Sequence, residues 1–110
     1  RDFSLELLPN HPPEIHLPDG IGSIQRSDHQ LICKKTGQTT RLSLPEALLN
    51  QPLQLKLHHA GKVRLYGKTP REDIKKIWQK HHVPVWMRSR TPLIFFEDQL
   101  VALMCESLNG

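Results

Sequence analysis

Glycine and cysteine are both scarce in this sequence, and each scarcity excludes a kind of functional site. The chain has six glycines and none is adjacent to another, so no glycine-rich loop is available to cradle a phosphate group. Its two cysteines, Cys33 and Cys105, do not form the Cys-x-x-Cys pairs typical of zinc sites. We therefore expect no metal site, no cofactor and no catalytic residue in this chain.

Long apolar segments are also missing. No run is long enough to cross a bilayer and no secretory signal is present, so we predict a cytoplasmic protein with no membrane partner. Both cysteines follow apolar neighbours, and we expect them to be reduced core residues rather than a disulfide. The sequence starts at Arg1 rather than at methionine, and we interpret it as a piece of a longer protein.

Histidines occur as two adjacent pairs, His58–His59 and His81–His82. Adjacent side chains point to opposite faces of a strand and diverge by about 100° on a helix. Neither pair can readily chelate one metal ion, so the roles of these four histidines stay open.

Positive charge is concentrated in one part of the chain. Residues 56–90 hold ten lysines and arginines against two acidic residues, a net charge of +8, whereas residues 1–31 have a net charge of −3. Such a dense cationic block favours a polyanionic partner. The alternative is a basic face that is simply solvated, and charge alone does not decide between them.

The length of 110 residues predicts one small domain. Residues 1–14 carry three prolines and little periodicity, which indicates a linker remnant, and residues 15–110 are predicted to form the domain. Alternating apolar residues predict short strands joined by hairpin turns at residues 35–38, 59–61 and 97–98. In the hairpin of residues 53–66, one polar face would carry Lys56, His58, Lys62 and Arg64.

One main helix is predicted over about residues 70–82. Thr69 and Glu72 fit a capping box with Pro70 at the first helical position, and Pro84 disfavours a helix beyond His82. An apolar stripe follows the helical period at Ile74, Ile77 and Trp78.

Four motifs follow one another in the second half of the chain. They are Lys-Lys-Ile-Trp-Gln at 75–79, Val-Pro-Val-Trp-Met-Arg at 83–88, Pro-Leu-Ile-Phe-Phe at 92–96 and Leu-Val-Ala at 100–102. In this order they resemble the C-terminal domain of the tRNA(Ile)-lysidine synthetase family, and Leu-Pro-Asp-Gly-Ile-Gly at 17–22 is a weaker likeness. The chain departs from the family at Val85, where a second proline is usual, and after residue 102, where a glycine is common.

The resemblance implies an α+β fold of short, mostly antiparallel strands in a sandwich-like arrangement with one main helix, similar to a tRNA-synthetase β-chain module. The family is a bacterial ligase that attaches lysine to the wobble cytidine of the tRNA(Ile) anticodon, which changes codon specificity from AUG to AUA. Its ATP and Mg site lies on a Ser-Gly-Gly-x-Asp-Ser loop of an N-terminal domain, and this sequence lacks that loop. The implied role is a tRNA-binding domain without the catalytic site of its parent enzyme.

The implied partner is tRNA(Ile), held chiefly through its backbone near the acceptor end. The candidate contacts are ten basic residues: Lys56, Lys62, Arg64, Lys68, Arg71, Lys75, Lys76, Lys80, Arg88 and Arg90. The alternative function is a protein-interaction module that packs on the N-terminal catalytic domain or forms a homodimer.

Two tryptophans and one arginine each have a structural and an RNA-binding interpretation. Trp78 lies on the apolar stripe, so we expect it in the core rather than stacked on a base. Trp86 is expected to pack under the helix, with an RNA-facing ring as the alternative. Arg88 suits a bidentate phosphate contact, with a salt bridge to Asp73 or Glu97 as the alternative.

Overall fold

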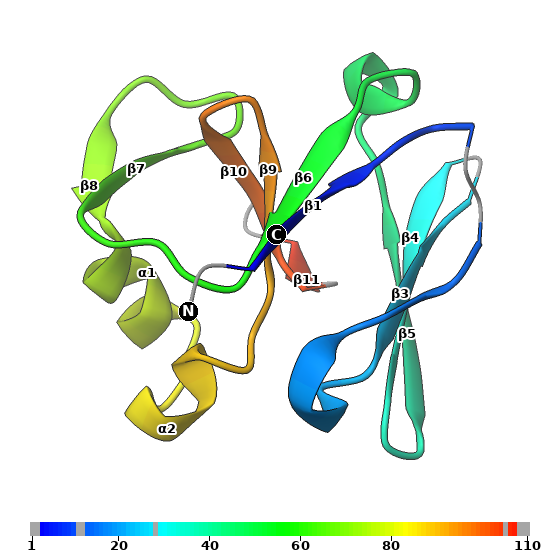
Figure 1. Ribbon diagram of the computed structural model, residues 1–110. Coiled ribbons are helices and arrows are strands. Elements are labelled where there is room, and N and C mark those ends of the chain that lie inside the picture. Colours follow the sequence, from blue (N-terminus) through cyan, green and yellow to red (C-terminus); the bar gives the residue numbers. More distant parts are fainter. Residues whose placement is uncertain (1–2, 11–12, 28, 105, 108–110) are drawn as a thin grey trace.

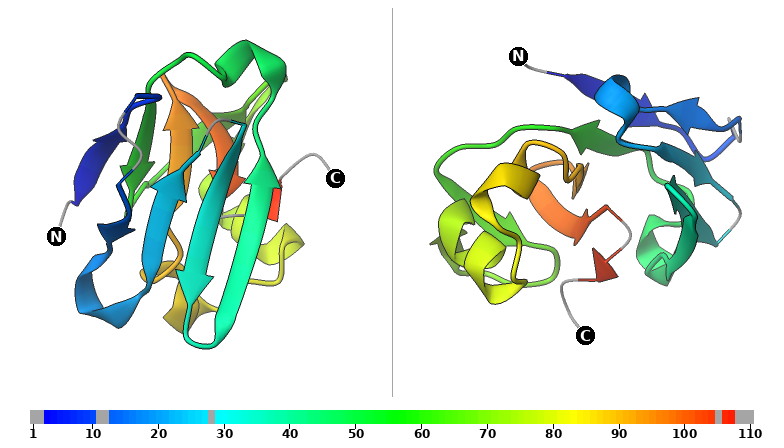
Figure 2. Two further views of the ribbon diagram at one scale, coloured as in Figure 1. Left: turned by 90° about the vertical axis from the view of Figure 1, so that its right-hand side faces the viewer. Right: turned by 90° about the horizontal axis from the view of Figure 1, so that it is seen from below.

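The computed structural model describes residues 3–10, 13–27, 29–104 and 106–107, arranged in three layers (Figure 1). A seven-stranded sheet forms the middle layer. Helix α1 (Ile74–Lys80) packs on one of its faces, and a four-stranded sheet packs on the other (Figure 2). The predicted α+β class with a sandwich-like arrangement of strands is confirmed.

The four-stranded sheet is an antiparallel meander. Its strands, in spatial order, are β2 (Ile15–His16), β3 (Ser23–Arg26), β4 (Gln30–Lys35) and β5 (Gln38–Ser43). Lys35 pairs with Gln38, which leaves Thr36 and Gly37 as the turn of the hairpin predicted there. A 3₁₀ turn, η1 (Pro18–Gly20), joins β2 to β3.

Gly22 lies where this sheet brings two backbones close together. Its φ is +138°, and an added Cβ would lie 2.1 Å from the carbonyl oxygen of Lys34. Both the conformation and the contact require a residue without a side chain.

The seven-stranded sheet combines neighbours that are far apart in the sequence. In spatial order it contains β1 (Ser4–Leu7), β6 (Leu53–Lys56), β9 (Leu93–Phe96), β10 (Gln99–Leu103), β7 (Lys62–Leu65) and β8 (Arg71–Asp73), with β11 (Glu106–Ser107) also paired to β10. The β9–β10 hairpin with its turn at Glu97 and Asp98 is confirmed. Strand β1 lies within the stretch of residues 1–14 that was predicted to be a linker.

The predicted hairpin of residues 53–66 was wrong. Strand β6 pairs with β1 and β9, and β7 pairs with β8 and, in parallel, with β10. The β9–β10 hairpin therefore separates the two strands that a local turn at residues 59–61 was expected to join. A run of four apolar residues in β9 suits a central strand that is buried on both faces, and this long-range preference overrides the local turn.

Two hydrophobic cores lie on opposite faces of the central sheet, and β9 contributes to both. Ile94 belongs to the core between the two sheets, where Leu31 of β4 is fully buried. Phe95 belongs to the core under α1, together with Leu65 of β7 and Trp78, which is 6% exposed. The expectation that Trp78 is a core residue is confirmed.

The main helix was predicted in the right place but with the wrong start. It begins at Ile74 and not at Pro70, because Arg71–Asp73 form strand β8 against β7. The side chain of Asp73 caps the helix by accepting a 2.9 Å bond from the Lys75 backbone N–H. The helix ends at Lys80, near the predicted stop.

Arg26 ties three segments of the chain together from a buried position. Its side chain is 2% exposed. Nη1 donates to the carbonyl oxygens of Leu7 (2.8 Å) and Gln51 (2.6 Å), and Nη2 donates to those of Leu48 (2.8 Å) and Leu49 (3.2 Å). Burial lowers the pKa of Arg26. The guanidinium thereby holds the end of β1 and the 3₁₀ turn η2 (Glu46–Leu48) against β3.

Cys33 corrects another expectation. It is buried in β4 with 1% of its surface exposed, as predicted, but it is disulfide-bonded and not a reduced thiol. Cys105 lies outside the described residues.

Candidate nucleic-acid interface

Helix α1 presents lysines on the side opposite its buried stripe. Ile74, Ile77 and Trp78 are buried against the central sheet, so the other residues of α1 point outward. Lys75, Lys76 and Lys80 are all exposed. Three of the ten candidate cations therefore lie on the exposed side of α1.

The segment after α1 folds into a second, four-residue helix, α2 (Val85–Arg88), which was not predicted. Arg88 is partly buried, and its Nε donates a 3.1 Å bond to the carbonyl oxygen of Val83. Neither of the two salt bridges considered for Arg88 occurs among the described residues. Arg90, two residues later, is exposed.

Trp86 overturns the expectation that it packs under the helix. Its side chain is 77% exposed, and that of Val85 is 72% exposed. Helix α2 contains no buried residue. Because Trp86 is exposed, the RNA-facing alternative stays a prediction for it. Val85 is an exposed apolar neighbour that was not predicted. The signal for Val85 was its place after Pro84, outside the apolar period of α1.

A groove of about 490 Å³ lies between the two helices and the loop of residues 57–61. Trp78 forms part of its lining, as do Lys75 of α1 and Arg88 of α2. His58 and His59, for which no role was predicted, line the opposite wall. The groove was not predicted, because residues 59–61 were expected to form a tight hairpin turn.

Lys56 lies on the same face of the central sheet as α1. In the β6–β9 register it lies opposite Leu93, which belongs to the core under α1. Its Nζ lies 4.8 Å from the centroid of the Phe95 ring. The helix-side cations are defined here as six residues: Lys56, Lys75, Lys76, Lys80, Arg88 and Arg90. None of the six forms an ion pair within the described part of the chain.

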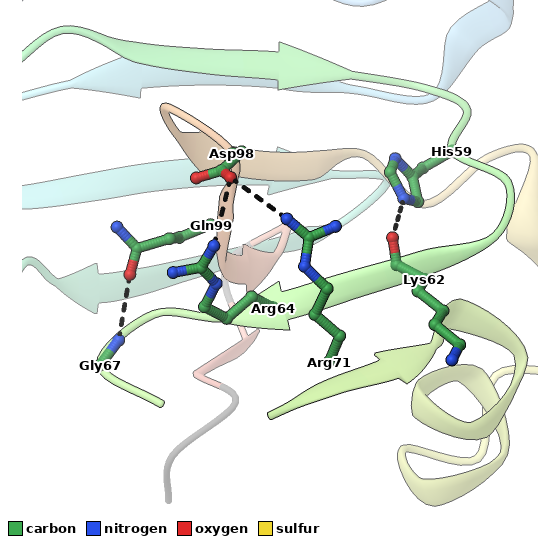
Figure 3. A network of polar contacts seen from close by, with 7 residues as sticks. All are labelled: His59, Lys62, Arg64, Gly67, Arg71, Asp98 and Gln99. Carbon is green, nitrogen blue, oxygen red and sulfur yellow. Dashed lines mark hydrogen bonds and ion pairs between the residues drawn. The ribbon is translucent and has the colours of Figure 1, made fainter. Parts of the chain in front are cut away.

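Arg64 and Arg71 belong to a different environment (Figure 3). Asp98 Oδ2 lies 3.5 Å from Nη2 of Arg64 and 3.8 Å from Nη2 of Arg71. In the register of the sheet, Arg64 of β7 lies beside Gln99 of β10, and Gln99 lies opposite Phe96 of β9. Phe96 packs on the face of the central sheet that meets the four-stranded sheet. The two arginines therefore point away from the face that carries α1.

The remaining candidates lie near the edge formed by β7 and β8. Lys62 is exposed and pairs with Asp73 across the two strands. Lys68 is exposed in the loop between them. The single polar face expected for the hairpin of residues 53–66 does not exist, because Lys56 and Arg64 lie on opposite faces of the sheet.

His59 is held in place by its neighbours. Its Nε2 lies 3.0 Å from the carbonyl oxygen of Lys62, and its ring lies 5.5 Å from that of Phe95, centroid to centroid. No group of three or more histidine, cysteine, aspartate or glutamate side chains suited to a metal ion occurs in the described ranges. None of the described helices is long and apolar enough to cross a membrane.

This geometry defines a class of protein: a small three-layer α+β domain that presents lysines, arginines and an exposed tryptophan on its helical side. Comparison with known proteins narrows the class. The TilS substrate C-terminal domain family matches residues 53–104, which contain both helices and the helix-side cations. Curated proteins named tRNA(Ile)-lysidine synthase match most of the chain.

Three of these relatives illustrate the similarity. The protein from Actinobacillus pleuropneumoniae serotype 3 is 56% identical over 85 residues, which cover 77% of this chain and 20% of the relative. The protein from Haemophilus ducreyi is 47% identical over 95 residues, covering 86% of this chain and 22% of the relative. The protein from Buchnera aphidicola is 28% identical over 93 residues, covering 84% and 18%.

The chain belongs to the tRNA(Ile)-lysidine synthase family, and residues 53–104 are its TilS substrate C-terminal domain. The predicted family is therefore confirmed. The chain spans about a fifth of the length of the curated relatives it matches.

Proposed function

We propose that this chain is the tRNA-recognition domain of a bacterial tRNA(Ile)-lysidine synthase. The parent enzyme would use ATP and Mg to join lysine to the wobble cytidine of tRNA(Ile), a ligase reaction. This chain would bind the tRNA and take no part in the chemistry. ATP and Mg would bind the part of the parent that corresponds to the remaining four-fifths of the relatives, because no glycine-rich loop is present here.

The observation that carries this proposal is that the helix-side cations form no ion pair among the described residues. Arg64 and Arg71 each pair with a carboxylate, that of Asp98. The six helix-side cations have no such partner among the described residues, and they concentrate positive charge on one side of the domain. A surface of this kind favours phosphate, and backbone contacts would position the RNA without reading its sequence.

The proposed partner is tRNA(Ile), contacted chiefly on its backbone near the acceptor end. That location rests on the family resemblance, as does a cytoplasmic location of the parent. The disulfide at Cys33 is a feature that argues against the cytoplasm, where thiols are kept reduced. Titration of Cys33 in denatured protein, purified from the cytoplasm under non-oxidising conditions, tests whether the disulfide forms there: a reactive Cys33 thiol would show that it does not.

The proposal is tested by measuring tRNA binding of the full-length protein across a range of salt concentrations. Each phosphate contact should contribute about −0.7 to −0.9 to the slope of log affinity against log salt. A combined alanine variant of Lys75, Lys76, Lys80, Arg88 and Arg90 should bind weakly and with a shallower slope. Arg41→Ala is the matched control, because Arg41 is exposed on the four-stranded sheet, away from α1.

Wild-type affinity and slope in the combined variant would mean that these cations only form a solvated face. Competition with bulk tRNA separates recognition of tRNA(Ile) from general RNA binding. Release of AMP by the chain on its own, in the presence of lysine and tRNA, would contradict a purely recognising role.

A second candidate function is supported by the exposed apolar pair Val85 and Trp86. These residues would suit a surface that docks on the catalytic part of the parent or on a second copy. Binding through an apolar surface should depend little on salt, whereas binding through phosphate contacts should weaken steeply.

A further inference from the structure

Helix α2 displays Trp86 on a fixed support. The Met87 N–H donates to the carbonyl oxygen of Pro84 (2.9 Å), and the Thr91 Oγ1 hydroxyl donates to that of Met87 (2.8 Å). Thr91 is itself buried. Trp86 is 77% exposed, and no aromatic ring stacks on its indole within the described part of the chain. An exposed aromatic ring on a rigid backbone is suited to stacking against a flat ligand.

The groove beside Trp86 adds charge to this arrangement. Val85, the residue before Trp86, lines the groove together with Arg88 and Lys75. Asp73 also lines it, but one of its carboxylate oxygens already accepts the Lys75 N–H. The groove lining therefore combines apolar residues with the cations Lys75 and Arg88, and Trp86 follows directly after one of the lining residues, Val85.

A ligand that matches both features must be flat, apolar on its faces and negatively charged nearby. Nucleotides have these properties, and aromatic side chains among lysines and arginines are typical of single-strand binding surfaces. A base inside a duplex has both faces covered by its neighbours, so only an unpaired or terminal base can stack on a side chain.

We propose that Trp86 and the adjoining groove bind an unpaired nucleotide of RNA. Trp86 stacks on the base, and Lys75 and Arg88 contact the flanking phosphates. This inference rests on the proposed function and deepens it, because it assigns base stacking as well as backbone contact to the helical side.

The test measures the affinity of the full-length protein for two RNAs, a blunt duplex and the same duplex with a short single-stranded extension. Wild-type protein should bind the extended RNA more tightly. Trp86→Ala should weaken binding of the extended RNA by about 5-fold or more and leave the blunt duplex unchanged. Trp86→Tyr should keep most of the extra affinity for the extended RNA over the blunt duplex, which is called the gain below. Trp86→Leu should lose this gain, because leucine is apolar but has no aromatic face.

Lys76→Ala is the matched control. Lys76 is exposed on α1 but does not line the groove, so its loss should weaken both RNAs equally. If wild-type protein binds tRNA(Ile) but neither of the two RNAs, only this inference is overturned; if it does not bind tRNA(Ile) either, the proposed function fails as well. If it binds both equally, or if Trp86→Ala does not lower the gain, only this inference is overturned. If Trp86→Leu keeps the gain that Trp86→Ala loses, the residue makes an apolar contact, and base stacking is overturned.

Discussion

Arg64 and Arg71 stand directly opposite each other on β7 and β8, and one carboxylate oxygen of Asp98 lies within 3.8 Å of both side chains. Like charges in directly opposed positions destabilise a sheet. Asp98 reaches this pair from the β9–β10 turn and offsets the repulsion. The relationship explains why we place the proposed RNA contacts first on the helix-side cations, which have no such partner among the described residues.

Asp98→Asn should lower the free energy of unfolding by up to about 1 kcal/mol, because exposed ion pairs contribute little. The loss should shrink as salt is added, since salt screens both the attraction and the repulsion. Urea unfolding at low and high salt measures it. Glu97→Gln is the control, because Glu97 is an exposed neighbour in the same turn without an ion pair among the described residues. A loss that does not change with salt would contradict the electrostatic explanation.

Arg88→Lys should weaken tRNA binding although the charge is kept. Lysine cannot reproduce a bidentate contact with phosphate, and it would also lose the bond from Nε to the Val83 carbonyl that orients the side chain. Filter binding with tRNA(Ile) measures the change. Lys80→Arg is the converse control, and it should bind at least as well as wild type. Equal affinity of Arg88→Lys and wild type would mean that Arg88 contributes only its charge to tRNA binding and makes no bidentate contact.

Trp78→Ala should destabilise the domain by about 3–5 kcal/mol, because the ring is buried between α1 and the central sheet. That loss is enough to unfold many small domains. Thermal unfolding followed by circular dichroism is the measurement. Gln79→Ala, at the next and exposed position of α1, should be nearly neutral. An unchanged melting temperature for Trp78→Ala would show that the ring does not belong to the core.

Arg26→Met should cost at least about 2 kcal/mol. The substitution keeps much of the side-chain volume but leaves the buried carbonyl oxygens of Leu7 and Leu48 without a donor, and each such group costs about 1–3 kcal/mol. Chemical denaturation measures the loss, with exposed Arg41→Met as the control. A loss no larger than that of the control would mean that water replaces the guanidinium without penalty.

Gly22→Ala should be far more harmful than Gly20→Ala. Both glycines have positive φ, which costs other residues about 1–3 kcal/mol. Only at Gly22 would the new Cβ also collide with a backbone oxygen, that of Lys34, whereas at Gly20 nothing lies within 4 Å. Comparing the two melting temperatures isolates the collision. Equal losses would show that the β3–β4 backbone can move apart at little cost.

Local patterns predicted the elements whose partners are close in sequence. The hairpins around Gly37 and Asp98 formed as expected, because tight turns bring adjacent strands together. The apolar stripe that contains Trp78 was also buried as predicted. The start of the helix was not predicted, since the capping box at Thr69 and Glu72 competes with pairing of Arg71–Asp73 to β7, and the helical pattern was given precedence.

The candidate site was predicted less completely than the fold. Lys75, Lys76 and Lys80 share a face because the helical period requires it, and sequence shows that period directly. Lys56 and Arg64 were expected on one face, but they lie on opposite faces because another hairpin separates their strands. The exposure of Trp86 depends on which element covers α2, and a single sequence carries no information on that.

The position of the β9–β10 hairpin between β6 and β7 also affects how the domain can fold during synthesis. Strands β6 and β7 leave the ribosome first, but neither can complete its pairing until residues 93–103 have followed them. The nascent chain therefore carries two half-paired apolar strands for a time, and such segments are prone to aggregate. Assembly of the central sheet must wait for its last-made hairpin, so slowing translation before residue 93 should prolong the vulnerable stage.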